Sequence, residues 1–585
     1  MSRLARHRGG SHPSAGMAVH IKSMTTQSRQ PKGIPVGGQF APDTRAEASL
    51  ALRHAADIIP DLIDLTPETQ QVLDALRAAG GRPLIVGGAV RDGLLSRTQG
   101  GTVDSMDVDI EVYGLSKEEV RRALPGDVNE FGQAFGVFNT SLNGQDFDVT
   151  LPRQDNKTGD GYRGFVVDTD PDMPFETAFA RRDFTMNAMG WDSETGELVD
   201  PLGGRADLGA GILRHTGNKF SEDPLRVLRG VQFAGRFNME LAPETAELCH
   251  EMAPAFDQLH KDGIWKQFRK LSTEGTHISK ALEALHASGW EKHFPGLAAT
   301  RGVPQDLRWH PEGEVIVHLG MAGDQAAAIA RRDGLDEEET SILVLAAITH
   351  DFGKAHSTKI EADGTIKSGG HHETGIEPAR EFLDGIGAPG KYHEKILPLI
   401  REHMCHTPGG GVEITPSAVR RLLRRLDNAG GGPTLKQWSR LVEADKAGRG
   451  PGARHTRNYV PDWLAVAEKI GNETAVSKTL LKGPHLADAG IPKGKLWAII
   501  VSQSEEAQDD GAFSDEAGAR EWLASNEEAI MTEAKRRLQK SEAAYAKKKA
   551  AQDIVTKARV AEQKAAAKVL RASKREAAGA AANAS

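Results

Sequence analysis

The 585-residue sequence has only two cysteines, Cys249 and Cys405, which lie far apart in the chain. They exclude a disulfide-built framework and favour a reducing, cytoplasmic location. The sequence also lacks any run of 18 apolar residues, so it predicts no membrane-spanning helix. Charged residues make up 26% and hydrophobic residues 39%, as in ordinary globular proteins. The length exceeds that of a single domain and indicates three or four.

Acidic residues are missing from the N-terminal end of the sequence. Residues 1–42 contain six Lys or Arg residues and no Asp or Glu, and residues 534–576 contain fourteen basic residues against four acidic ones. Since the net charge is −8, the middle of the chain is acidic and its two ends are basic. This distribution suits an enzyme that handles RNA, and solvated tails are the alternative interpretation.

Residues 66 to about 205 show alternating helical and strand patterns. TPETQQVLDALRAAG has a Thr cap and a Gly stop and predicts a helix. Short apolar runs predict strands in RPLIVGG, MDVDIEVYGL, FGVFNTSL and QDFDVTLPR, and LSKEEVRRAL predicts a helix. This alternation indicates an α/β region. Beyond residue 215 helical periodicity dominates, with breaks near residues 300 and 450, and residues 534–576 predict an exposed basic helix.

A Gly-Gly turn follows the first predicted strand. Gly87 and Gly88 let the backbone approach a ligand closely, and the N-terminus of the next helix directs N–H groups at an anion. Arg91 adds a planar fork of donors suited to phosphate. Such a turn alone is more typical of packing, so its meaning depends on the motifs around it.

Two aspartates in the second predicted strand form a candidate metal site. Asp107 and Asp109 stand at i and i+2, so both carboxylates project from the same face of the strand. Two close negative charges are unfavourable unless a cation lies between them. Asp148, in a later strand, is a candidate third carboxylate, and three such groups can hold two Mg²⁺ ions for phosphoryl transfer. The aspartates of DTDPD, at 168, 170 and 172, are expected in a loop.

Five motifs occur in a fixed order: GGAVRD, MDVDIEV, ARRDFTMNAM, DPLGGRADL and SEDPLRVLRGVQFAGRF. In this order they resemble the class II tRNA nucleotidyltransferase/poly(A) polymerase family, over roughly residues 66–300. The resemblance implies an α/β nucleotidyltransferase head with a polymerase-beta-like palm, followed by an all-α neck. The sequence departs from the family at Met106, where a lysine is common, and in the polar insert RTQGGTVD.

The resemblance also implies roles for individual residues of the head and neck. Asp107 and Asp109 match the family's metal-binding pair, and Asp148 matches its third acid. The residues that match triphosphate, ribose and base contacts are Gly87, Gly88, Arg91, Arg181, Arg182, Asp183, Asp223, Arg226 and Arg229.

The last three of these residues also have a physical argument of their own. On a helix, Asp223, Arg226 and Arg229 fall along one face, where Asp acceptors and Arg donors can read a base edge. The alternative interpretation is a surface salt bridge. In the family this motif selects CTP or ATP.

Residues 301–450 are rich in histidine. His350 and Asp351 stand next to each other, with His318 upstream and further histidines downstream, and such residues can gather around a divalent metal of undecided identity. The order resembles HD-domain phosphohydrolases, in particular the HD domain fused to some bacterial nucleotidyltransferases. The positions that match the ligand set are His318, His350, Asp351, His371, His403 and Asp445. His371 fits because Gly375 lies four residues on, and His372 is its rival.

The motifs together predict six segments. They are a disordered basic extension (1–65), the head (66–205), the helical neck (206–300), the HD domain (301–450), a helical tRNA-binding region (451–533) and a basic Ala/Lys-rich helical tail (534–585). The expected function is the addition or repair of the 3′-CCA end of tRNA from CTP and ATP, with Mg²⁺ in the head. The HD domain is expected to add a phosphohydrolase activity on RNA 3′ ends, with a divalent metal of undecided identity.

Several alternatives to this function remain. One is a poly(A) polymerase or an enzyme that adds only part of CCA, and another is an HD phosphohydrolase that uses the head to bind RNA. The long basic signature associated with bacterial poly(A) polymerases is not evident downstream of the carboxylate strand, which favours tRNA. The expected partner is tRNA, contacted at its 3′ end and its elbow, and the sequence leaves the oligomeric state open.

Overall fold

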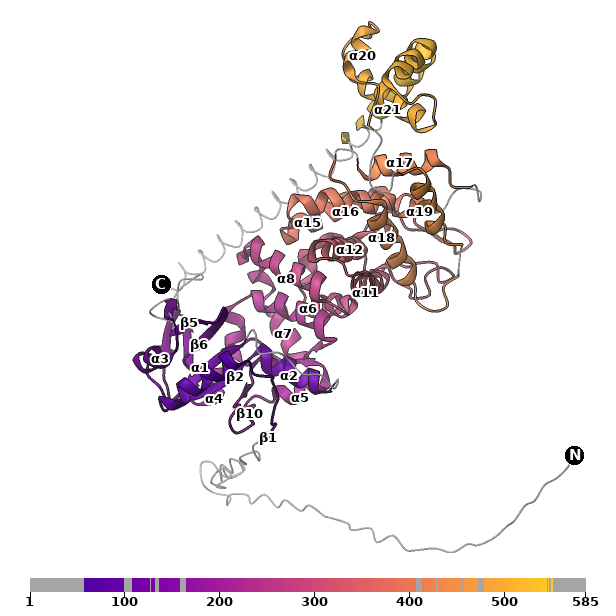
Figure 1. Cartoon of the computed structure of the whole chain (residues 1–585). Coiled ribbons are helices and arrows are strands. Elements are labelled where there is room, and N and C mark those ends of the chain that lie inside the picture. The colour runs from indigo at the N-terminus through magenta and orange to yellow at the C-terminus, as the bar shows by residue number, and fades with distance from the viewer. Residues whose placement is uncertain are drawn as a thin grey trace, which may run out of the picture.

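The computed structural model describes residues 57–98, 108–126, 128–131, 136–157, 165–406, 413–427, 430–454, 457–471, 478–543, 545–546 and 549–550. Along this chain the segments follow one another in space as they do in sequence, from the sheet-containing head at one end to α20 and α21 at the other (Figure 1). The predicted architecture, an α/β head followed by helical regions, is confirmed.

The head is built on an eight-stranded mixed sheet with the strand order β1-β10-β9-β2-β3-β6-β5-β4. Most neighbours are antiparallel, but β3 and β6 are parallel. The strands are β1 (Asp57–Ile58), β2 (Arg82–Val86), β3 (Asp109–Tyr113), β4 (Val128–Phe131), β5 (Val137–Leu142), β6 (Gln145–Thr150), β9 (Gly190–Trp191) and β10 (Glu197–Val199).

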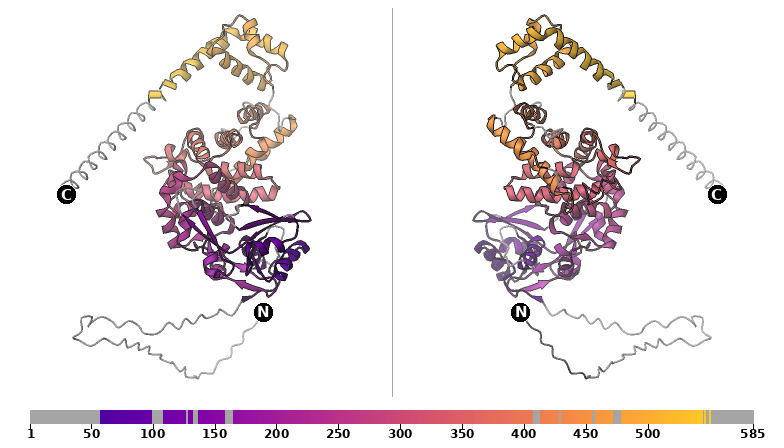
Figure 2. Two further views of the ribbon diagram at one scale, coloured as in Figure 1. Left: turned by 90° about the vertical axis from the view of Figure 1, so that its left-hand side faces the viewer. Right: turned by 90° about the vertical axis from the view of Figure 1, so that its right-hand side faces the viewer.

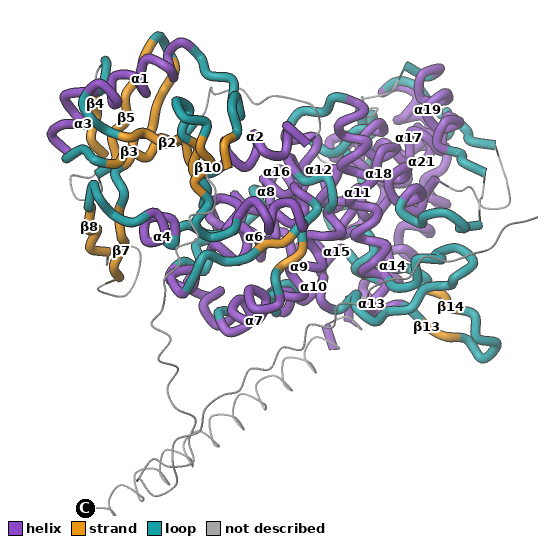
Figure 3. The backbone as a smooth tube through the Cα atoms, turned by 90° about the horizontal axis from the view of Figure 1, so that it is seen from below, coloured by secondary structure: helices purple, strands orange, loops and turns teal. Residues whose placement is uncertain are grey.

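Five helices accompany this sheet, and a separate hairpin stands beside α4 (Figure 3). The helices are α1 (Pro67–Ala78), α2 (Gly88–Thr98), α3 (Lys117–Ala123), α4 (Phe175–Phe179) and α5 (Gly204–Ala210), and the hairpin strands are β7 (Arg153–Lys157) and β8 (Phe165–Thr169). The predicted helices over TPETQQVLDALRAAG and LSKEEVRRAL are therefore present. The expectation that Asp168 lies in a loop was wrong, because this residue pairs with Gln154 in the hairpin.

The neck contains the helices α6 (Leu225–Phe237), α7 (Pro243–Glu251), α8 (Lys261–Glu274), α9 (Ile278–Ala287) and α10 (Pro295–Ala298). A short parallel pair, β11 (Ile212–Leu213) with β12 (Glu240–Leu241), joins the segments before and after α6. Glycine permits the close packing of α6: a Cβ on Gly235 would lie 2.5 Å from the Leu271 side chain of α8.

The histidine-rich region is a helical body with one small hairpin. Its helices are α11 (Val315–Asp333), α12 (Glu337–Thr349), α13 (Lys354–Ser357), α14 (His371–Thr374), α15 (Ile376–Ile386), α16 (Gly390–Glu402), α17 (Pro416–Leu426) and α18 (Leu435–Ala447), and the hairpin pairs β13 (Lys359–Ile360) with β14 (Ile366–Lys367). Helix α12 is buried along its length from Thr340 to Thr349, so its C-terminal end delivers His350 to the interior.

The C-terminal part begins with α19 (Val460–Lys469), continues through α20 (Gly483–Asp488) and α21 (Lys495–Asp509), and ends in a helix over residues 516–543. This last helix packs along α21, where Gln503 donates to the Ile530 carbonyl oxygen at 3.3 Å and Arg537 lies 2.7 Å from Glu506. Figure 2 shows these C-terminal helices, in gold and yellow, at the far end of the described chain from the indigo head. Residues from Leu481 onward form an apolar core of their own, separate from the core that runs continuously from the head to α19. Where α17 meets α21 the contacts are ionic, with Arg424 2.8 Å from the buried Asp509.

Candidate functional site

The strands β3 and β6 bring two of the predicted carboxylates together. Asp109 and Asp148 are direct partners in the parallel register of these strands, and both side chains are exposed. Asn139, on the neighbouring strand β5, donates its Nδ2–H to Asp148 Oδ1 at 3.1 Å. Asp107, the first residue of the predicted metal pair, lies outside the described residues. The described part of the site therefore presents two adjacent carboxylates, Asp109 and Asp148, on two central strands of the sheet. They form the carboxylate edge of the head.

The Gly-Gly turn after β2 lies directly against this edge. Gly87 has φ +78°, and a Cβ at this position would lie 2.9 Å from Arg182 Nη1 and 3.6 Å from Asp109 Oδ2. Only glycine accommodates both the left-handed backbone and the close approach of these groups. Arg91 is buried: its Nη1 donates to Asn187 Oδ1 at 2.6 Å, and its guanidinium lies over the ring of Phe237.

One carboxylate of this region was not identified from the sequence. Glu111 stands two residues after Asp109 on the same face of β3 and is fully buried. Its Oε2 lies 2.6 Å from Arg181 Nη2, and its Oε1 accepts a hydrogen bond of 2.7 Å from the Tyr113 hydroxyl. Arg182 Nη2 approaches it at 3.6 Å. Glu111 thus anchors both arginines of the RRD motif. The i, i+2, i+4 alternation of the strand was the sequence signal that could have placed Glu111 on the same face as Asp109.

Asp183, the acid of the same motif, is buried and ion-paired with the neck. Arg229 contacts its Oδ2 from Nε at 2.8 Å and from Nη2 at 2.6 Å, and Asn187 Nδ2 and the Phe184 N–H donate to Oδ1. Burial alone would raise the pKa of Asp183, but Arg229 and these hydrogen bonds hold it below its ordinary value. The head and α6 are therefore joined through a charged carboxylate.

The structure corrects the prediction that Asp223, Arg226 and Arg229 share one helix face. Helix α6 begins at Leu225, so Asp223 precedes it in an extended conformation and accepts from the Leu225 N–H. Arg226 donates to the carbonyl oxygens of Arg181 and Lys219, at 2.6 Å and 3.0 Å. Arg226 therefore holds the backbone of the RRD motif in place through these hydrogen bonds.

A cavity of about 500 Å³ lies between the head and the neck, and the predicted residues that line it are Gly87, Gly88, Arg91, Asp109, Arg181, Arg182, Asp183, Asp223, Arg226 and Arg229. Gly87, Asp109 and Arg182 lie on the head side, and α8 contributes Gln267 and Lys270. Neither of these α8 residues was identified from the sequence, since nothing in a helical pattern marks which face meets another domain.

The predicted HD residues converge from five segments of the chain. His318 lies in α11, His350 and Asp351 follow α12, His371 opens α14, His403 follows α16, and Asp445 lies near the end of α18. All six are buried.

Their side chains meet around the two aspartates. Asp351 Oδ1 lies 3.1 Å from His371 Nε2 and 3.8 Å from His403 Nε2, and its Oδ2 lies 3.4 Å from His350 Nε2. Asp445 Oδ1 lies 3.2 Å from His318 Nε2. His372, the rival of His371, is only partly buried, and its ring centre lies 5.9 Å from that of His371.

The hydrogen bonds of these rings fit a metal site. The Nδ1 atoms of His350, His371 and His403 donate to the carbonyl oxygens of Ala347, Ser368 and Ile400 at 2.6–2.7 Å. Each of these rings therefore turns the lone pair of its Nε2 inward, as metal-binding imidazoles do.

Two further observations at the same centre agree with this arrangement. The Nε2 atoms of His371 and His403 lie only 3.1 Å apart, and the Nε2 atoms of His318 and His350 and Asp351 Oδ1 are buried without a hydrogen-bond partner. Burial and the neighbouring His350 lower the pKa of His403 to about 3, so this imidazole is neutral. Buried nitrogen and oxygen atoms with unused lone pairs, gathered in this way, suit a divalent cation.

Two cations lie beside the aspartates. Lys354 Nζ is 2.5 Å from Asp351 Oδ2 and also donates to Gln305 Oε1, and Arg449 lies 3.2 Å from Asp445. Although burial raises the pKa of both carboxyls, Lys354 and Arg449 respectively hold them well below the ordinary value. Both aspartates are therefore charged and available as ligands.

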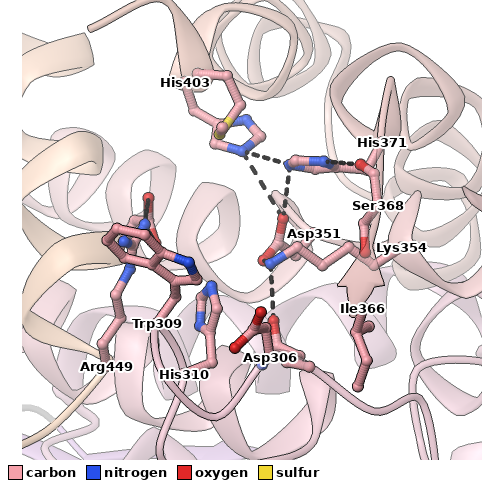
Figure 4. A pocket seen from close by; sticks show the side chains of 13 residues that line it. Asp306, Trp309, His310, Asp351, Lys354, Ile366, Ser368, His371, His403 and Arg449 are labelled. Carbon is pink, nitrogen blue, oxygen red and sulfur yellow. Dashed lines mark hydrogen bonds and ion pairs between the residues drawn. The ribbon is translucent and has the colours of Figure 1, made fainter. Parts of the chain in front are cut away.

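A cavity of about 290 Å³ opens onto this centre, and four of the six residues line it: Asp351, His371, His403 and Asp445. Trp309, His310 and Arg449 lie on one side of it, opposite Lys354 and His371 (Figure 4). The two sites of the chain are thus both pockets that combine carboxylates with basic side chains.

Comparisons with known proteins agree with this division into two sites. The family model described as "Poly A polymerase head domain" matches residues 84–214, and the model described as "HD domain" matches residues 315–429. The "Multifunctional CCA protein" of Xanthomonas oryzae pv. oryzae is 34% identical over 432 residues, which cover 72% of this chain and 99% of the relative. The protein of that name from Stenotrophomonas maltophilia (strain R551-3) is 35% identical over 429 residues, with coverage of 72% and 99%. The chain belongs to this family.

Family membership confirms the resemblance seen in the motifs and implies the use of a divalent metal. Among solved structures, the Bacillus stearothermophilus CCA-adding enzyme in complex with CTP aligns with 80% of this chain and 100% of its own, at 20% identity and a TM-score of 0.49. A complex of a CCA-adding enzyme with ATP covers 79% and 95%, at 19% identity and a TM-score of 0.48. Within the described residues, no helix has both the length and the apolar character needed to cross a membrane.

Proposed function

We propose that this chain builds or repairs the 3′-CCA end of tRNA from CTP and ATP, without a nucleic-acid template. The observation that carries the proposal is the register of β3 and β6, which sets Asp148 opposite Asp109, a residue that lines the head–neck cavity. Its support from relatives is the match to a multifunctional CCA protein over 99% of the relative's length and 72% of this chain. The proposal includes a cytoplasmic location, in keeping with the unpaired Cys249 and Cys405.

The head residues would act on the triphosphate and the RNA end. Asp109 and Asp148, with Asp107 from the same motif, would hold Mg²⁺, which when bound lowers the pKa of the primer 3′-hydroxyl and stabilises the leaving pyrophosphate. The turn at Gly87 and Gly88 would bring backbone N–H groups to the triphosphate, with Arg91 as its buried support.

The remaining head and neck residues would recognise the nucleotide. Arg181, Arg182 and Asp183 would contact the ribose. Asp223, Arg226 and Arg229 would read the base once their present protein contacts are exchanged for the nucleotide. Both groups line the same cavity.

A second activity is proposed for the HD site, because its donor set suits a metal of its own. The six proposed ligands are His318, His350, Asp351, His371, His403 and Asp445. Lys354 and Arg449 would bind the phosphate oxygens of an RNA end. At this site, water would cleave a phosphoester bond at the 3′ end of the RNA, which is also the end to which the head would add nucleotides.

Matched variants test the assignment of the two sites. Asp148→Ala should abolish incorporation of labelled CTP into tRNA that lacks its CCA end. Asp146→Ala should preserve this incorporation. Asp146 is exposed on the same face of β6, but its partner in the sheet is Ser141 of β5 and not Asp109. Equal loss in both variants would contradict the assignment of Asp148.

The HD site is tested with a separate pair of changes. His350→Ala should abolish hydrolysis of a 2′,3′-cyclic phosphate at an RNA end to a phosphomonoester and leave incorporation intact. Asp109→Ala should do the reverse. Loss of both activities from either change would refute two independent sites and favour a single shared function.

A further inference from the structure

The four histidines of the HD centre are held in two different ways. Three of them, His350, His371 and His403, donate Nδ1–H to a backbone carbonyl of their own turn. His318 instead has its Nδ1 2.9 Å from Oε1 of a side chain, Glu312. Because the backbone cannot be altered by substitution and a side chain can, His318 is the one of these four histidines whose orientation depends on a testable residue.

Glu312 serves a second imidazole as well. His310 Nδ1 lies 2.8 Å from the same Oε1, while the Glu312 side chain is only 3% exposed. Glu312 Oε2 is buried without a hydrogen-bond partner, and His318 Nδ1 is close to Oε1 but not aligned as a hydrogen bond. A carboxylate has two oxygens, so a small rotation gives each ring an oxygen of its own and satisfies both orphaned atoms.

We propose that Glu312 is a positioning residue that links the metal site to the substrate pocket through His318 and His310. When Glu312 accepts the Nδ1–H of His318, it fixes the tautomer in which the lone pair of His318 Nε2 faces Asp445 and the metal. Accepting Nδ1–H from His310 leaves His310 Nε2 as an acceptor at the cavity. The inference rests on the proposed HD function and deepens it.

His310 has a defined place on the substrate side. It lines the cavity together with Trp309 and Arg449, across from Lys354 (Figure 4). The two cationic side chains suit phosphate oxygens, whereas an imidazole acceptor suits a hydroxyl group. The pocket therefore fits a phosphoester that carries a neighbouring hydroxyl, as on a ribose.

Metal binding separates this role from simple packing. We would titrate the full-length protein with Mn²⁺ by calorimetry and define binding at the HD centre as the part lost in His350→Ala. Glu312→Ala should raise the Kd of this ion about 10- to 100-fold. Glu312→Gln should recover part of the affinity, because its amide keeps one acceptor oxygen.

Two controls accompany these variants. Glu314→Gln changes an exposed carboxylate two residues away that accepts from the Gly302 N–H, and it should leave the Kd unchanged. His310→Ala should also leave the Mn²⁺ Kd unchanged but raise the KM for a ribose 2′-phosphate about tenfold, the size expected for one lost hydrogen bond. The KM for p-nitrophenyl phosphate, which has no such hydroxyl, should stay constant.

Three results would overturn the inference. An unchanged Kd in Glu312→Ala would show that His318 needs no carboxylate. Loss of one ion from the stoichiometry would make Glu312 itself a ligand. Absence of any His350-dependent ion in the unaltered protein would remove the metal site and with it the proposed HD function, which distinguishes that failure from the first two.

Discussion

The turn at Gly87 allows a sharp test, because the chain contains a matched glycine at the other end of the same strand. Gly87 and Gly80 flank β2 and have φ values of +78° and +94°. An added Cβ meets nothing within 4 Å at Gly80, but at Gly87 it lies 2.9 Å from Arg182 Nη1 and 3.6 Å from Asp109 Oδ2. The two alanine variants thus share the backbone strain and differ in the contact.

The left-handed conformation costs an alanine about 1–2 kcal/mol. We expect both variants to lose stability by about this amount in hydrogen exchange of the β2 amides. Only Gly87→Ala should also displace Arg182 and the carboxylate edge, and a shift of about 1 Å near the reacting groups lowers kcat/KM on the order of 100-fold. The assay is CTP incorporation into tRNA lacking CCA. An equal loss of kcat/KM in both variants, or none in Gly87→Ala, would refute the argument that this turn contacts the reacting groups.

Two further predictions concern buried carboxylates of the head. Glu111→Gln removes the negative charge that pairs with Arg181, whose side chain is 14% exposed, and should lower the stability of the β3 region by about 2–4 kcal/mol in hydrogen exchange. The control, Glu118→Gln at an exposed position of α3, should change this stability by no more than about 0.5 kcal/mol. Equal effects of the two changes would contradict the role of Glu111. Because the pKa of Asp183 is held below its ordinary value, its ion pair with Arg229 stabilises the fold above about pH 4 and is lost as the pH falls through the lowered pKa. Urea unfolding should therefore show an advantage of the unaltered protein over Asp183→Asn that shrinks on acidification, and an advantage independent of pH would disprove this linkage.

The sequence predicted the head where its patterns are periodic. Alternation along MDVDIEV and QDFDVT placed Asp109 and Asp148 in strands, and motif order brought them to one site. The same alternation also places Glu111 on that face, but a lone buried acid has no pattern that separates it from a surface acid. Asp168 was expected in a loop because prolines follow it, and the pairing of β7 with β8 is a long-range choice that local turn residues do not reveal.

At the helical sites of the neck and the HD region, other features could not be predicted from the sequence. Spacing along SEDPLRVLR could not show that Pro224 and the turn before it exclude Asp223 from α6. In the HD region the ligand types and their order were readable from the sequence. The sharing of Glu312 by His310 and His318 was not, because it depends on how the segment before α11 packs against the metal centre.

The central proposal is CCA addition, and the most direct measurement is the product formed on tRNA that ends before its CCA sequence. With Mg²⁺, CTP and ATP, the protein should add two C residues and then one A, and stop. With ATP alone it should not extend this tRNA, and with CTP alone it should stop after the second C. Long A tracts would contradict the account in favour of poly(A) synthesis, and absence of any addition beside an intact phosphoesterase activity would leave the HD site as the enzyme's only function.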